Sequence, residues 1–83
     1  MAFKRKGKME KLYEVYFNGS KRNFDRVSAT SKKEAEEKMK SFYPNDNVTG
    51  SKLIGWCYHG ERRDVLCSPD NGIDIITDFN DVF

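Results

Sequence analysis

The side chains with the clearest potential for chemistry are two thiols and one imidazole, those of Cys57, His59 and Cys67. Cys57 and His59 are two residues apart, so they would point the same way from a strand, and Asp64 or Asp70 is near enough in sequence to add a fourth ligand. Structural zinc sites usually carry paired C-x₂-C or H-x₃-H spacings, and this chain has neither. We therefore predict two core thiols and a turn histidine, with no metal ligands.

Other kinds of catalytic or cofactor site are also weakly supported. A Cys–His nucleophile pair needs an exposed thiol of low pKa in a cleft, which residues on paired strands do not offer. The segment Asp70-Asn71-Gly72, followed by Asp74, contains part of a calcium loop but not its full order of ligands. The chain has one histidine and contains no dinucleotide-binding or Walker loop. These features predict a protein that is not an enzyme and carries no cofactor.

Length and composition predict a single small domain. The chain has 83 residues, of which 34% are charged and 37% hydrophobic, enough for one modest core. No apolar run is long enough to span a membrane, and the first eleven residues, MAFKRKGKMEK, lack the apolar region of a secretory signal. We expect a cytoplasmic protein, in the host cytoplasm if it is phage-encoded, that does not bind membranes. Its two cysteines are then expected to be thiols without a disulfide.

These side chains must be positioned by a sheet and one helix, which is predicted over residues 31–42. Ser31 is a good N-cap with Glu34 three residues later, as in a capping box, and Pro44 prevents continuation. The expected apolar stripe consists of Ala35, Met39, Phe42 and Tyr43. A helix with one apolar stripe needs a sheet to bury it.

Alternating apolar residues predict strands on both sides of this helix. The expected strands are residues 12–18, 22–30, 48–59, 63–68 and 73–79. Asn18-Gly19 suits a hairpin turn, a bulge is expected near Asp25, and Gly72 should leave the turn after Pro69 in a left-handed conformation. The predicted fold is α+β: a single antiparallel sheet of about five strands, in the order β-β-α-β-β-β, with one helix packed on one face. Residues 1–10 are predicted to be a flexible basic arm, and residues 11–83 the single α+β domain.

Two of the predicted strands carry large apolar groups on both sides, and one helix covers only one face. The second face must be hidden by residues 79–83 folding back, by a second copy in a homodimer, or by a partner. The aromatic residues expected to anchor a protein partner on this open face are Tyr16, Trp56 and Tyr58. Tyrosine and tryptophan are typical anchors at protein interfaces.

The charge is unevenly distributed along the chain, which leaves a nucleic-acid partner open. Residues 1–43 carry a net charge of +6 and residues 44–83 a net charge of −4. The basic residues that could contact phosphates are Lys4, Arg5, Lys6, Lys8 and Lys11 in the arm, and Lys21, Arg22 and Arg26 on the first hairpin. Aromatic residues, among them Phe24, could stack on bases, although no basic residue alternates with Trp56 and Tyr58.

The run from Tyr13 to Cys67 resembles small phage-encoded proteins of β-β-α-β-β order, among them certain anti-CRISPR proteins. The similar features are a hairpin ending in Ala29-Thr30-Ser31, a helix that begins with S-x-x-E-A, and a strand, a glycine turn and a second strand that ends at Cys67. The resemblance implies a phage or mobile-element protein that inhibits a host complex by occupying its surface. It transfers no catalytic residues, and no basic target-contacting motif of that family is present.

Together, these observations predict a small non-enzymatic binding protein that engages a host protein or nucleoprotein complex through the open sheet face. The alternative is a protein that binds DNA or RNA directly through the basic arm and the first hairpin. Steep salt dependence would separate the two, because phosphate contacts release counterions and an apolar interface does not.

Overall fold

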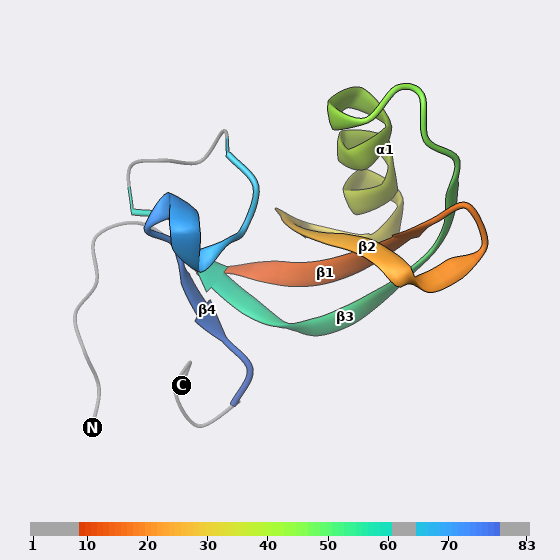
Figure 1. Cartoon of the computed structure of the whole chain (residues 1–83). Helices are drawn as coiled ribbons and strands as arrows, with labels where there is room; N and C mark the ends of the chain where they lie inside the picture. The colour runs from red at the N-terminus through yellow and green to blue at the C-terminus, as the bar shows by residue number, and fades with distance from the viewer. Residues whose placement is uncertain (1–8, 61–64, 79–83) are drawn as a thin grey trace.

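The computed structural model describes residues 9–60 and 65–78, which form one antiparallel sheet with a helix on one face (Figure 1). The elements in chain order are β1 (Met9–Phe17), β2 (Ser20–Ala29), α1 (Lys32–Phe42), β3 (Val48–Tyr58), the short 3₁₀ helix η1 (Pro69–Asn71) and β4 (Asp74–Ile76). Residues 1–8 of the arm predicted over residues 1–10 lie outside the described residues, as do the beginning of the predicted strand 63–68 and residues 79–83. Met9 and Glu10 belong to β1, so the prediction was wrong for the last two residues of the arm. Within the described ranges, neither helix has the length and hydrophobicity of a membrane span.

The β1–β2 hairpin forms around the predicted Asn18-Gly19 turn. Asn18 has a φ of 57° and Gly19 a φ of 74°, and a two-residue turn that matches strand twist needs positive φ at both positions. The irregularity predicted near Asp25 occurs instead next to the turn, where Tyr16 pairs with Phe24 but Phe17 pairs with Ser20. The additional residues of β2 are therefore accommodated between Ser20 and Phe24, and Asp25 pairs regularly with Val15.

Within residues 9–60 and 65–78 the sheet has four strands in the order β2-β1-β3-β4, so the prediction of about five strands was wrong by one. Residues 65–68 form no strand, because this segment crosses towards β2, where the Cys67 N–H donates to the Arg26 carbonyl at 3.3 Å. The chain then turns through η1, and Gly72 leaves it with a φ of 74°, as the sequence predicted. The last described strand is short and pairs with the end of β3, with Ile76 opposite Trp56.

Helix α1 begins at the predicted cap. The Ser31 side chain accepts from the Glu34 N–H at 3.2 Å, while the Glu34 carboxylate accepts from the Thr30 hydroxyl at 2.6 Å. Ala35 and Met39 are buried as predicted, but Phe42 is 44% exposed. Tyr43, at the C-cap, takes its place and packs edge-on against Phe17 with ring centroids 5.4 Å apart.

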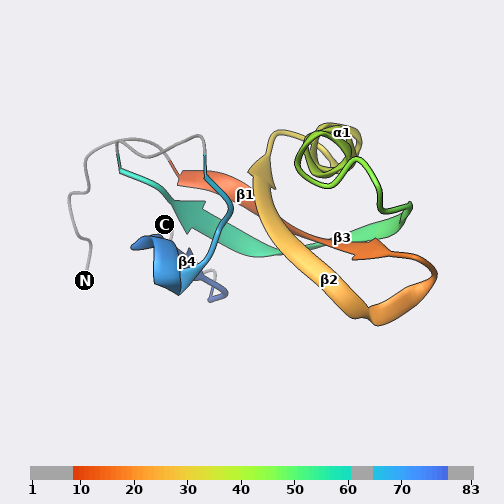
Figure 2. The same ribbon diagram turned by 45° about the horizontal axis from the view of Figure 1, so that its top comes forward.

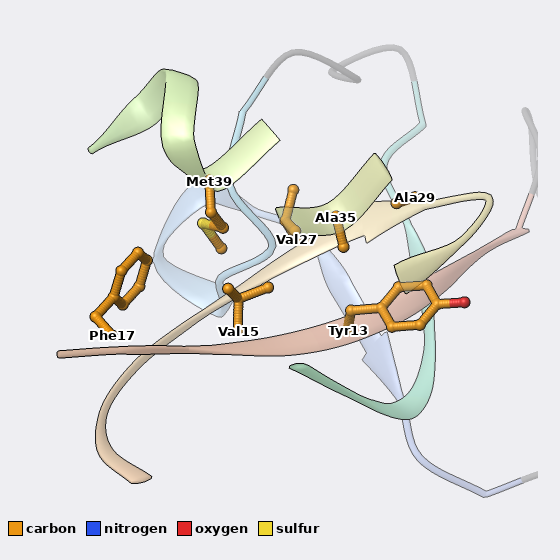
Figure 3. Packing of buried hydrophobic residues seen from close by; sticks show 7 residues of the cluster. All are labelled: Tyr13, Val15, Phe17, Val27, Ala29, Ala35 and Met39. Carbon is orange, nitrogen blue, oxygen red and sulfur yellow. The ribbon is translucent and has the colours of Figure 1, made fainter. Parts of the chain in front are cut away.

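The main core lies between α1 and one face of the sheet (Figure 3). Its buried members are Tyr13, Val15, Phe17, Val27, Ala29, Ala35 and Met39. β1 and β2 contribute alternate residues, as expected for strands that bury one face. The helix supplies the two small or flexible side chains that fill the space above them.

A second core lies on the opposite face of the sheet, at the end away from the hairpin turn. Leu12 is fully buried there against Cys57, Cys67 and Ile73. Figure 2 shows the segment that carries η1 beside this end of the sheet, while α1 occupies the other side. The apolar side chains on both faces of β1 are therefore covered by two different parts of the chain.

Gly55 permits the close approach of β4 to β3. A Cβ atom at this position would lie 2.2 Å from the backbone oxygen of Ile76, and backbone cannot move away as a flexible side chain can. We predict that Gly55→Ala lowers the free energy of unfolding by about 1–3 kcal/mol, the usual cost of overpacking, measured by urea denaturation. Gly50→Ala is the matched control, because its Cβ would meet only the Tyr16 ring at 3.7 Å. Equal stability of the two variants would contradict this assignment.

Tyr43 links the end of α1 to β2 and makes stability depend on pH. Its hydroxyl donates to the Asp25 carboxylate, and this hydrogen bond, together with burial and the charges of Asp25 and Asp46, raises the pKa of Tyr43 to about 12. In the unfolded chain the phenol loses its proton near pH 10. The stability that Tyr43 contributes is therefore present below about pH 10 and is lost as the pH rises towards about 12. Urea denaturation of the wild type and of Tyr43→Phe across this pH range should show a smaller loss of unfolding free energy in the variant. An equal loss in both proteins would contradict this role of Tyr43.

Candidate functional site

The three predicted aromatic anchors do not share one face of the sheet. Tyr16 pairs with Phe24 and Gly50, whereas Trp56 pairs with Lys11, whose partner on β2 is Ala29 in the core beneath α1. Directly paired residues point to the same side, and residues two apart on a strand do so as well. Trp56 and Tyr58 therefore lie on the helix side and Tyr16 on the opposite side. The prediction that all three residues form a single docking surface was therefore wrong.

The opposite side is open at the hairpin end, where two aromatic side chains lie next to each other. Tyr16 is half-buried, and its cross-strand partner Phe24 is 44% exposed. The Arg26 guanidinium lies over the Phe24 ring at 5.6 Å from its centroid. On the other side of Tyr16, Gly50 has no side chain to cover the ring. These residues form a partly apolar, accessible platform.

A shallow hollow of about 470 Å³ adjoins this platform. It is lined by Tyr16, by residues 19–21 and by residues 49–52. Lys21 and Lys52 are both exposed, and the lining contains no carboxylate. Two ammonium groups, hydroxyls and an aromatic ring suit a ligand that combines negative charge with a flat ring.

The walls of the hollow are held by hydrogen bonds between the hairpin turn and the start of β3. The Asn18 N–H donates to the Asn47 carbonyl at 2.7 Å, and the Gly19 N–H donates to Thr49 Oγ1 at 3.0 Å. Thr49 Oγ1 in turn donates to the Tyr16 carbonyl at 3.4 Å. The two sides of the hollow are thus fastened to each other across the sheet.

One carboxylate lies beside the platform, and its charge is matched. Glu14 accepts from the Tyr16 hydroxyl at 2.8 Å, and its other oxygen is 3.4 Å from Arg26 Nε. The hydrogen bond to Glu14 raises the pKa of Tyr16. Arg26 is therefore committed to Glu14 and Phe24, and Lys21 and Lys52 are the cations that line the hollow.

Only part of the predicted phosphate-contacting set comes together here. Lys21 lines the hollow, and Arg26 stacks on the platform. Arg22 is exposed on the same strand outside the lining, and Lys11 belongs to the helix side of β1. The remaining four, Lys4, Arg5, Lys6 and Lys8, lie outside the described residues. The sequence did not indicate Lys52 or Gly50 as site residues. Their alternation with Thr49 and Ser51 indicates that they share one face of β3, but which face becomes known only from the pairing of β3 with β1.

A second group of named residues comes together beneath the C-terminal segment. Cys57 and Cys67 are joined by a disulfide, so the expectation of two free thiols is corrected. His59 was predicted to be a turn histidine. It is only 5% exposed and therefore belongs to the protein interior. Its Nε2 lies 3.4 Å from Cys57 Sγ, 3.3 Å from Cys67 Sγ and 2.7 Å from Ser28 Oγ. The crossing of residues 65–68 towards β2 brings Cys67 to this position.

Comparisons with protein-family models, with curated proteins and with solved structures find no match to this chain. The resemblance to phage-encoded inhibitors therefore stays a prediction.

Proposed function

We propose that this protein binds single-stranded nucleic acid through its hairpin face, which we define as Tyr16, Lys21, Phe24, Gly50 and Lys52. The observation that carries the proposal is the position of two exposed lysines in a hollow that is walled by an aromatic ring and lined by no carboxylate. Aromatic platforms with cations along the backbone path are how proteins hold single strands without reading their sequence.

The two components of the face have separate roles. Phe24, exposed on β2, and the Tyr16 ring beside it offer stacking surfaces for unpaired bases. Lys21 and Lys52 neutralise phosphates and release their counterions. The Ser20 hydroxyl in the lining adds a donor for backbone oxygens. A paired duplex would keep its bases away from the platform, so the face suits unpaired strands.

Docking of a host protein or nucleoprotein complex is the second candidate function. It is favoured by Leu53, which is 42% exposed and pairs with Tyr13, on the helix side of the sheet. Trp56 lies on that same side of β3 and is half-buried. This docking surface would not include Tyr16, and salt would affect it little.

Charge removal at the hollow tests the phosphate contacts. We expect Lys21→Ala with Lys52→Ala to weaken binding of labelled single-stranded DNA and RNA in fluorescence anisotropy. For two lost phosphate contacts, the slope of log affinity against log salt should become shallower by about 1.4. Lys32→Ala with Lys33→Ala, an equal loss of charge at exposed positions of α1, is the matched control. Equal effects of the two pairs, or no binding by the wild type at low salt, would overturn the proposal; the second result would also direct the search to a protein partner.

Stacking is tested with a pair of phenylalanines of equal exposure. Phe24 and Phe42 are each 44% exposed, but only Phe24 adjoins the hollow-lining Tyr16. We predict that Phe24→Ala reduces the binding free energy by about 1–3 kcal/mol, the range for one stacked base, and that Phe42→Ala leaves it unchanged. Anisotropy titrations at one fixed salt concentration measure both. A loss on Phe42→Ala as large as that on Phe24→Ala would contradict stacking at the hairpin face.

A further inference from the structure

We propose that reduction of the Cys57–Cys67 disulfide converts the buried cluster of Cys57, His59 and Cys67 into a zinc-binding site. The nucleic-acid proposal does not use these residues, and the cluster lies at the other end of the same sheet face. Two thiolates and an imidazole are the ligands that structural and catalytic zinc sites share.

The ligands are brought together by the strand and the crossing segment. Cys57 points to the face that Leu12 occupies, and His59 is the first residue after β3. Cys67 arrives from the segment that crosses towards β2. The two cysteine Sγ atoms and one ring nitrogen of His59 all lie within 4.8 Å of one another. All three residues are buried.

The distances between these atoms fit a tetrahedral ion. Zinc bonds of about 2.3 Å to sulfur and about 2.0–2.1 Å to nitrogen place sulfur and nitrogen about 3.5 Å apart and the two sulfurs about 3.8 Å apart. His59 Nε2 is already 3.4 Å from one sulfur and 3.3 Å from the other. Only the sulfurs must separate. The Cα atoms of Cys57 and Cys67 are 6.7 Å apart, near the upper end of the range for disulfides. The backbone therefore leaves room for the two sulfurs to move apart.

The same histidine nitrogen also faces Ser28. Ser28 Oγ is 2.7 Å from Nε2, and Ser28 is itself almost fully buried at 2% exposure. Two sulfur atoms and one hydroxyl oxygen thus lie around one ring nitrogen. Three protein ligands leave a fourth position for water, as in catalytic zinc sites, and Ser28 is placed to hydrogen-bond that water.

The chemistry balances with a thiol as reductant. Two molecules of a small thiol, RSH, reduce the disulfide to two cysteine thiols and become one RSSR. One Zn²⁺ then replaces the two thiol protons, which are released to solvent, and accepts the lone pair of neutral His59. In the oxidised chain the disulfide links β3 to Cys67, and in the reduced chain the ion makes the same link. The C-terminal cover over Leu12 is therefore retained in both states.

Zinc binding by the reduced, full-length chain tests this proposal. We expect competition with a chromogenic chelator and native mass spectrometry to give one zinc ion per chain, with two protons lost. The oxidised chain, identical in sequence, should bind none. Co²⁺ in place of zinc should give thiolate-to-metal charge transfer and the intense visible bands of a tetrahedral site. No zinc bound after reduction, equal binding by the oxidised chain, or a cobalt spectrum without thiolate bands would overturn the proposal.

Two variants resolve the roles within the site. Cys67→Ser is expected to lower zinc affinity by more than about a hundredfold, which exceeds the usual effect of losing an outer partner. Ser28→Ala, which keeps all three ligands, is expected to lower it by about tenfold. Unchanged affinity in reduced Cys67→Ser would overturn the assignment. The cobalt spectrum of the wild type decides the question if that variant does not fold.

Discussion

The structure depends on one constraint: β1 is an interior strand with buried side chains on both of its faces. Val15 and Leu12 are both fully buried, yet they point to opposite sides of the sheet. A strand of this kind needs a cover above and below, and burying a leucine or valine contributes about 1.5–3 kcal/mol each. Because α1 is the one α-helix among the described residues, the two covers come from different parts of the sequence.

The two covers differ in extent, and this difference shapes the accessible surface. Helix α1 lies over the side of β1 that carries Tyr13, Val15 and Phe17. The segment with Cys67 and Ile73 covers the other side only around Leu12. The hairpin end of that side, with Tyr16, is left open. The candidate interface thus lies at the uncovered end of this face, and the Cys–His cluster lies at its covered end.

The sequence predicted the parts of the fold that local chemistry determines. The Asn18-Gly19 turn, the cap at Ser31 and the left-handed Gly72 each follow from the conformational preferences of one or two residues. The strand count failed because residues 65–68 have strand-like composition but use a backbone donor, the Cys67 N–H, to reach the Arg26 carbonyl. Such a long-range hydrogen bond leaves no local signal.

The kinds of residue in the candidate site could be predicted from the sequence, but the full set of residues that form it could not. Lys21 and Phe24 were recognisable from their residue types, whereas Lys52 joins them only through the β1–β3 register. A bulge at Ile54 changes that register between Leu12 and Tyr13, so alternation from the N-terminal part of β3 cannot be continued to Trp56. For the same reason the aromatic residues of β3 could not be assigned to a face from the sequence. His59 was missed as an interior residue because the crossing segment that buries it has no sequence signature.

The most direct test of this account is residue-resolved NMR, in which the amide signals of isotope-labelled protein are followed as a short single-stranded oligonucleotide is added. We expect the amide signals that shift to belong to the hairpin face, namely those of Tyr16, Lys21, Phe24, Gly50 and Lys52. The amides of Trp56 and Tyr58, on the helix side, should stay in place. Shifts confined to Trp56, Tyr58 and their neighbours, or no shift at any residue, would contradict the assignment of function to the open hairpin end of the sheet.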